Sequence, residues 1–147
     1  MREVAFTIAQ EAVVCLIDVF IKQPDYLYLC CYNEFVITRG VMRIIFLKQA
    51  RKELEHCPAD LITDALAYID DLASGIMLSM PVSRPLPSVA KGLHELRISE
   101  RSGEYRIFYV IKVGDAIYIL HVTHKKTQKM DARTIQLVKN RLKEIES

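Results

Sequence analysis

Basic side chains that could contact a phosphate group lie in three segments of the C-terminal third of the chain. Arg97 and Arg106 fall in two successive strand-like segments, and Lys125 and Lys126 directly follow a third. Arginine offers a planar fork of donors and lysine a point charge, and both can stabilise negative charge on phosphorus without a metal ion. This pattern predicts cleavage of RNA, in which a 2′-hydroxyl attacks the neighbouring phosphate.

The reaction also needs a base for the attacking hydroxyl and an acid for the leaving oxygen. His121 and His124 are candidates, but they are three residues apart and would face opposite sides of a regular strand. At most one of them is expected in the site unless the strand has already ended. Further candidates are His94, Tyr109 and a lysine with a lowered pKa.

The same basic residues also have ordinary structural explanations. Arg106 could form a surface ion pair with Glu104 or Glu95, and such a pair adds little stability. His121 could cap the sheet edge or form a hydrogen bond in the core. Three basic residues of the last expected helix are interpreted as a solvated face: Lys139, Arg141 and Lys143.

Charge is unevenly distributed along the chain. Residues 91–147 contain twelve basic and seven acidic side chains, whereas the whole chain has a net charge of only +2. Such asymmetry favours a surface that meets a polyanion, although a solvated helix face with scattered charges explains it equally well. We add Lys91 and Lys129 as candidate RNA contacts.

The periodicity of apolar residues predicts an α+β fold. It indicates a strand, two helices, a connector rich in proline and glycine, three strands joined by short turns, and a last helix that Asp131 caps. The expected ranges are 43–47, 48–56, 58–73, 75–92, 93–98, 104–113, 116–123 and 131–146. The resulting expectation is an antiparallel sheet of about four strands, with all helices on one side.

Alternation along 104–113 separates the two faces of the middle strand. Tyr105 and every second residue after it are expected to form the core face, which leaves Arg106 on the opposite face. Arg97 projects to the same side from the preceding strand. The sequence therefore predicts a cationic surface on the face of the sheet away from the core.

Residues 1–41 differ from the rest because no turn or cap pattern organises them. Arg39 and Gly40 could be encoded by a stretch that resembles a bacterial ribosome-binding site upstream of Met42. We expect a domain at 42–147 that begins at Met42, with 1–41 as an extension from a mis-assigned start. A genuine N-terminal helix and strand is the alternative.

Composition argues against a disordered chain, a disulfide-rich protein and a membrane protein. Apolar residues make up 51% and charged residues 26%, which is typical of a globular domain. The four cysteines form no C-x-x-C pair, so we expect reduced thiols in a cytoplasmic protein, with neither a metal nor another cofactor. Because charged residues interrupt every apolar stretch, we expect no membrane segment.

Three motifs occur together in this order: "GLHELRI" at 92–98, "YRIFY" at 105–109 and "LHVTHKKTQK" at 120–129. Over about 42–147 the chain resembles the RelE/HigB superfamily of type II toxins, in its phage-derived HigB-like branch. The resemblance implies a RelE-like fold, with two N-terminal helices and a C-terminal helix. His94 stands where the family often has an aromatic residue, and Met130 and Asp131 replace a usual proline.

The resemblance also implies a function. Members cleave mRNA, often on the ribosome, and thereby inhibit translation, and a helix-turn-helix antitoxin blocks them. By the matching motifs, the catalytic residues would be Arg97, Arg106, Lys125, Lys126 and His124. Two alternatives share the fold: a ParE-like gyrase inhibitor and an inactive relic that only binds an antitoxin.

Overall fold

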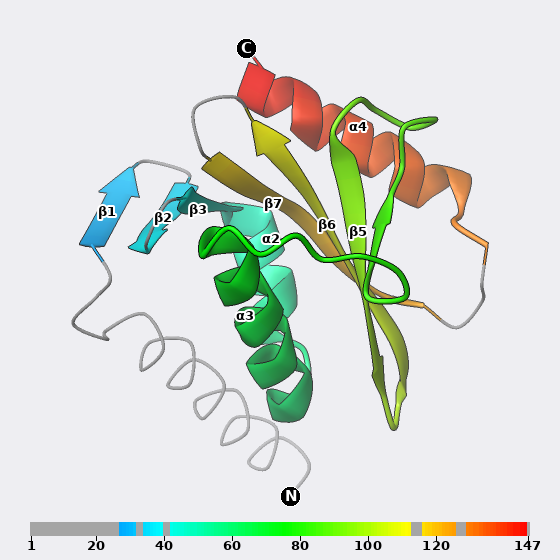
Figure 1. Cartoon of the computed structure of the whole chain (residues 1–147). Helices are drawn as coiled ribbons and strands as arrows, with labels where there is room; N and C mark the ends of the chain where they lie inside the picture. Colours follow the sequence, from blue (N-terminus) through cyan, green and yellow to red (C-terminus); the bar gives the residue numbers. More distant parts are fainter. Residues whose placement is uncertain (1–26, 32–33, 40–41, 113–115, 126–128, 147) are drawn as a thin grey trace, which may run out of the picture.

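The computed structural model describes residues 27–31, 34–39, 42–112, 116–125 and 129–146. These residues form seven strands and three helices (Figure 1). In chain order the elements are β1 (Leu27–Cys31), β2 (Glu34–Arg39), β3 (Met42–Leu47), α2 (Lys48–Glu55), α3 (Ala59–Ala73), β4 (Ser83–Pro85), β5 (Leu93–Glu100), β6 (Gly103–Lys112), β7 (Ala116–Lys125) and α4 (Ala132–Glu146). The predicted α+β class is confirmed.

The strands form one mixed sheet in the order β1-β2-β3-β7-β6-β5-β4. All neighbours are antiparallel except β3 and β7, which run parallel. The prediction of an antiparallel sheet of about four strands is therefore wrong in strand number and in direction. Two helices and a three-stranded meander separate β3 from β7, and so long a connection lets the chain return in the same direction.

Strands β1 and β2 come from the segment that the sequence left unorganised. They pair antiparallel with each other, and β2 continues the sheet beyond β3, at one side of the molecule in Figure 1. The described part of this segment therefore belongs to the same sheet as the rest of the chain. A native start at Met42 stays a prediction.

Helices α2 and α3 follow β3 as the periodicity predicts. Pro58 precedes α3, and Gly75 adopts a φ of +89° directly after Ser74, where the helix ends. The apolar stripe of α3 is buried: Leu61, Ile62, Ala65, Ile69 and Leu72. The two helices cover the face of the sheet that carries Ile107.

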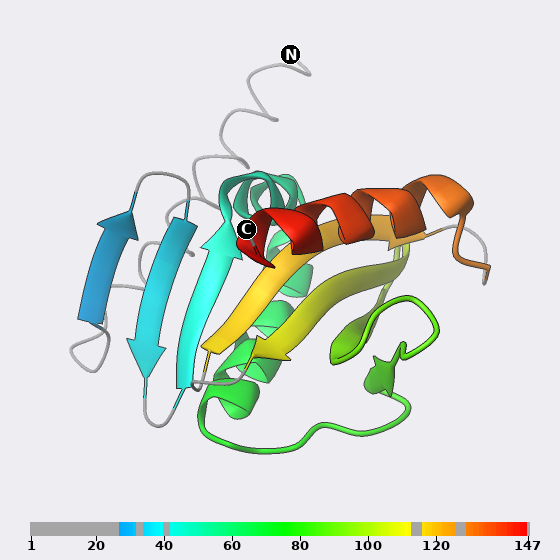
Figure 2. The same ribbon diagram turned by 90° about the horizontal axis from the view of Figure 1, so that it is seen from above.

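The other face of the sheet is buried as well. Phe108 and Val110 are no more than 1% exposed, although alternation assigns them to the outer face. Helix α4 lies along β7 on this side, where Arg141 contacts Leu120 and His121 (Figure 2). The prediction that all helices lie on one side is wrong, because these apolar side chains need a cover of their own.

Helix α4 begins as predicted. The backbone N–H of Thr134 donates a hydrogen bond to Oδ1 of Asp131 over 2.6 Å, which satisfies one of the free donors at the helix start. Val138 and Leu142 are buried, as expected for its inward side. This start places the residues before α4 beside the end of β7.

Candidate functional site

Three of the predicted basic residues meet on one face of the sheet. Arg97 and Arg106 are direct partners across β5 and β6, and Lys125 lies two positions further along, opposite Glu104. Because residues that share a strand's parity share a face, all three side chains leave the sheet on the side of Phe108. We call Arg97, Arg106 and Lys125 the basic cluster.

Two carboxylates lie within the basic cluster. Glu95 accepts hydrogen bonds from Arg97 through Oε1, with Nε and Nη2 both 2.8 Å away. Arg106 donates through Nε to Oε1 of Glu104 over 2.9 Å, and its Nη1 lies 3.6 Å from Oε2 of Glu95. Glu95 therefore lies between two arginines that would otherwise repel each other across the strands.

Burial separates these contacts from ordinary surface ion pairs. The side chains of Arg106 and Glu95 are 3% and 1% exposed, whereas that of Arg97 is 24% exposed. The alternative explanation for Arg106 is thus right that it pairs with Glu104 and Glu95, but wrong that the pair lies on the surface. Oε2 of Glu95 is buried without a hydrogen bond among the described residues, which is costly for a carboxylate.

Lys125 is the most unusual member of the basic cluster. It is only 7% exposed, and its Nζ donates a hydrogen bond to the carbonyl oxygen of Lys129 over 2.7 Å. Burial lowers its pKa and the charge of Arg106 lowers it further, while nearby carboxylates partly oppose the shift. A lysine of this kind gives up its proton more readily than an exposed one.

His124 and His121 leave β7 on opposite sides, as their spacing predicts. His124 stacks on Tyr105 with ring centroids 4.5 Å apart, on the face away from the basic cluster, and its Nε2 lies 2.9 Å from the carbonyl oxygen of Ser102. His121 is on the side of the basic cluster but stacks on Phe108. The structure therefore does not bring His124 to the basic cluster.

The other candidates for proton transfer are also directed elsewhere. His94 stacks on Tyr109, and the hydroxyl of Tyr109 lies 2.7 Å from Oγ of Ser83. Burial raises the pKa of Tyr109, and the hydrogen bond with Ser83 only partly offsets this. Both rings lie on the face of the sheet that α3 covers.

The remaining predicted residues that the structure describes lie at the margin of the basic cluster or away from it. Lys91 is exposed and precedes β5, at the opposite end of that strand from Arg97. Lys129 is exposed and joins the basic cluster only through its carbonyl oxygen. Lys126 lies outside the described residues.

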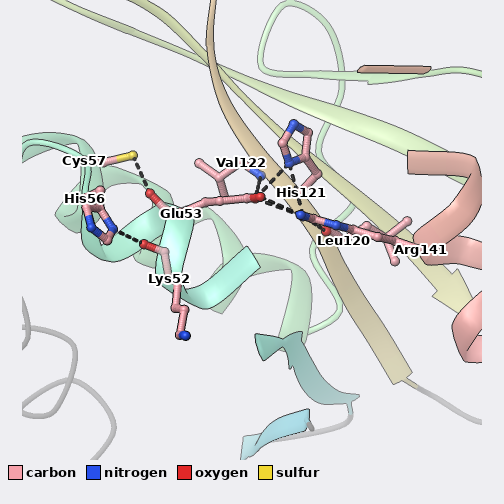
Figure 3. A network of polar contacts seen from close by, with 8 residues as sticks. All are labelled: Lys52, Glu53, His56, Cys57, Leu120, His121, Val122 and Arg141. Carbon is pink, nitrogen blue, oxygen red and sulfur yellow. Dashed lines mark hydrogen bonds and ion pairs between the residues drawn. The ribbon is translucent and has the colours of Figure 1, made fainter. Parts of the chain in front are cut away.

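A second polar network, which the sequence did not reveal, joins α2, β7 and α4 (Figure 3). Glu53 of α2 binds Arg141 of α4, with Oε1 2.7 Å from Nη2 and Oε2 3.0 Å from Nη1. Arg141 is 8% exposed, so its interpretation as part of a solvated helix face is wrong. The two residues are 88 positions apart, and only the folded chain brings them together.

Glu53 also binds β7 directly. Its Oε2 accepts the backbone N–H of Val122 over 2.9 Å and lies 2.8 Å from Nδ1 of His121. Because a carboxylate only accepts hydrogen bonds, the short distance places a proton on Nδ1 of His121. Arg141 lies 3.2 Å from the same nitrogen, and since both groups are then donors, no hydrogen bond forms between them. The tautomer of His121 is thus fixed by Glu53.

These contacts set the ionisation of Glu53. Burial raises its pKa, but hydrogen bonds from His121, Arg141 and the N–H of Val122 outweigh burial and hold the pKa below its usual value. Cys57 nearby is affected in the opposite sense: burial and the charge of Glu53 raise its pKa to about 11. The thiol is therefore protonated at neutral pH and a poor nucleophile.

Among the residues that the structure describes, no group of three or more His, Cys, Asp or Glu side chains could hold a metal ion. Of the helices described, none is long and apolar enough to span a membrane.

Comparison with models of protein families assigns most of the chain to a family. The family model described as "Phage derived protein Gp49-like (DUF891)" matches residues 52–143, from within α2 to within α4. The matched range contains both polar networks. No curated protein matches the chain.

Proposed function

The chain belongs to the phage-derived Gp49-like family, a HigB/RelE-like family of toxins in toxin–antitoxin contexts, and on this premise we propose that it is an mRNA endoribonuclease. We further propose that it cleaves mRNA on the ribosome in the cytoplasm, without a metal ion. The family context also implies an antitoxin as a partner.

The observation that carries this proposal is the basic cluster with its buried lysine. The guanidinium groups of Arg97 and Arg106 would hold the phosphate and stabilise its charge as the 2′-oxygen bonds to phosphorus. The bond from phosphorus to the 5′-oxygen then breaks, which leaves a 2′,3′-cyclic phosphate and a 5′-hydroxyl. Lys125, with its lowered pKa, is suited to move one of the two protons.

The other predicted residues have supporting roles in this scheme. Lys126 and Lys129 would guide the RNA strand towards the basic cluster, and Lys91 would contact it beyond the far end of β5. His124 would act only on RNA that passes around the end of β7, because its ring lies on the opposite face.

Replacement of Lys125 tests the proposal most directly. Lys125→Met keeps the length and apolar stem of the side chain but removes the charge and the proton. We expect cleavage of mRNA in a translating extract to fall about 10²-fold or more, and growth arrest on expression to disappear. Lys143→Met, at an exposed lysine of α4, is the matched control and should cleave normally.

A folded Lys125→Met variant with full activity would contradict the assigned site. Loss of DNA supercoiling by the wild-type protein, without RNA cleavage, would instead indicate a ParE-like gyrase inhibitor.

A second candidate function is that of an inactive relic that binds an antitoxin. Arg97 and Arg106 already contact Glu95 and Glu104, and Lys125 contacts a backbone carbonyl, so a phosphate must compete with these partners. The absence of both toxicity and cleavage in the wild-type protein would favour this function.

A further inference from the structure

Strand β7 has a neighbouring strand on one side for only part of its length. Strand β3 pairs with residues 116–119 of β7, whereas β6 pairs with β7 as far as Lys125. From Leu120 onward, no described strand pairs with the β3 side of β7. Among the described residues, this part of β7 therefore has no neighbouring strand on that side, and unpaired edges are sites where another strand can add.

Side chains occupy the first part of this edge. Nη1 of Arg141 donates to the carbonyl oxygen of Leu120 over 2.9 Å, and the N–H of Val122 donates to Oε2 of Glu53. The Glu53–Arg141 ion pair thus supplies the donor and the acceptor that a neighbouring strand would supply. Because Val122 directs its N–H to this edge, its C=O does the same, and so do the N–H and C=O of His124.

A groove lies next to the second part of the edge. It has a volume of about 560 Å³, with Lys52, His56 and Cys57 on the α2 side and Val122, Thr123 and His124 on the β7 side. Figure 3 shows Glu53 of α2 reaching Val122 at the start of this stretch of β7. The backbone groups of His124 therefore face an open space bounded by a helix.

We infer that this edge binds an extended segment of the antitoxin by β-strand addition. The backbone of the added segment would bond to the C=O of Val122 and to both backbone groups of His124. The inference rests on the proposed toxin–antitoxin function for the identity of the partner, while the edge itself specifies an extended peptide.

The charged residues at the groove indicate which side chains the added segment should carry. Lys52 is exposed on the helix side of the groove, whereas the charge of Glu53 is balanced by Arg141. The segment should therefore carry an acidic side chain towards Lys52.

Hydrogen exchange at the backbone amide of His124 tests the inference in the full-length protein, free and in complex with its cognate antitoxin. We expect fast exchange in the free protein and exchange at least ten-fold slower in the complex. Unchanged exchange within a formed complex would overturn the inference, and so would protection in the free protein, which would mean that the chain fills its own edge. If no complex forms, the antitoxin is not the occupant.

RNA cleavage is measured separately, so the proposed function can stand when the inference fails.

A pair of variants at His124 separates the contribution of the backbone from that of the side chain. His124→Pro removes the donor at a position where an edge strand tolerates proline, and His124→Ala keeps the donor but removes the ring. We expect affinity for the antitoxin about ten-fold weaker for the proline variant than for the alanine variant. Equal affinities would contradict β-strand addition.

Lys52→Glu tests the charge and does not depend on whether the proline variant folds. It should weaken binding about ten-fold relative to Lys143→Glu, an exposed reversal on α4. The same affinity in both reversals would exclude an acidic segment at Lys52.

Discussion

The two arginine–glutamate networks of this protein differ in how completely their polar atoms are bonded. Glu53 uses both oxygens, towards Arg141, His121 and the N–H of Val122. Glu95 uses Oε1 towards Arg97, while its Oε2 is buried without a hydrogen bond among the described residues and lies 3.6 Å from Arg106. One network is closed and the other is left open.

This difference suggests that one network stabilises the fold and that the other serves the proposed activity. A closed network of charges holds three elements in fixed positions, and its loss would leave charges buried and unpaired. The open network leaves one acceptor, Oε2 of Glu95, buried without a hydrogen bond, and it lies near a lysine with a lowered pKa. We therefore expect substitutions in the first network to affect folding, and substitutions in the second to affect activity.

The largest effect on stability is expected for Arg141→Ala. This change leaves Glu53 without its main partner and the carbonyl of Leu120 without a donor, so the free energy of unfolding should fall by about 3–5 kcal/mol. Urea unfolding measures the change. Arg133→Ala is the control, because Arg133 is exposed near the start of α4, and a loss of no more than about 0.5 kcal/mol is expected there. Similar losses in both variants would remove the distinction between the networks.

A smaller and pH-dependent effect is expected for Glu53→Gln. The amide cannot accept all the hydrogen bonds of the carboxylate, so the variant should lose about 1.5–3 kcal/mol at pH 7. The folded pKa of Glu53 lies below its ordinary value of 4.5, so its contribution is complete above pH 4.5 and disappears as pH falls through the folded pKa. The difference in unfolding free energy between the wild-type protein and the variant should therefore shrink from pH 7 to pH 4.5 and again to pH 3, as measured by urea unfolding at each pH. A constant difference would show that the charge of Glu53 is not responsible.

The smallest loss of stability is expected for Glu95→Gln, about 1 kcal/mol, because the amide oxygen can still accept the bond from Arg97 and Oε2 has no hydrogen bond to lose. Its effect on activity is more informative. Glu95 raises the pKa of Lys125, so its removal should lower that pKa further. The limb of the pH–rate profile that reports Lys125 should move to lower pH. An unmoved profile would mean that Lys125 does not titrate in the reaction.

Much of the local structure could be predicted from the sequence. The periodicity of apolar residues gave α3 and its buried stripe, and Asp131 marked the start of α4, because both signals arise from neighbouring residues. Alternation also placed Arg97 and Arg106 on one face and separated His121 from His124. It could not show that this face is covered, since burial of Phe108 depends on a helix that comes later in the chain.

The sequence by itself determined which residues share a strand and a face, because the twofold repeat of a strand is a local property. It thereby determined the basic cluster and the family motifs that surround it. Only the tertiary structure decided that β3 lies parallel to β7 and stops halfway along it. That arrangement brings Glu53 to Arg141 and leaves the edge at His124 without a described neighbour, while Lys125 is buried beside the residues that precede α4. Each of these depends on contacts between distant segments, which no local pattern encodes.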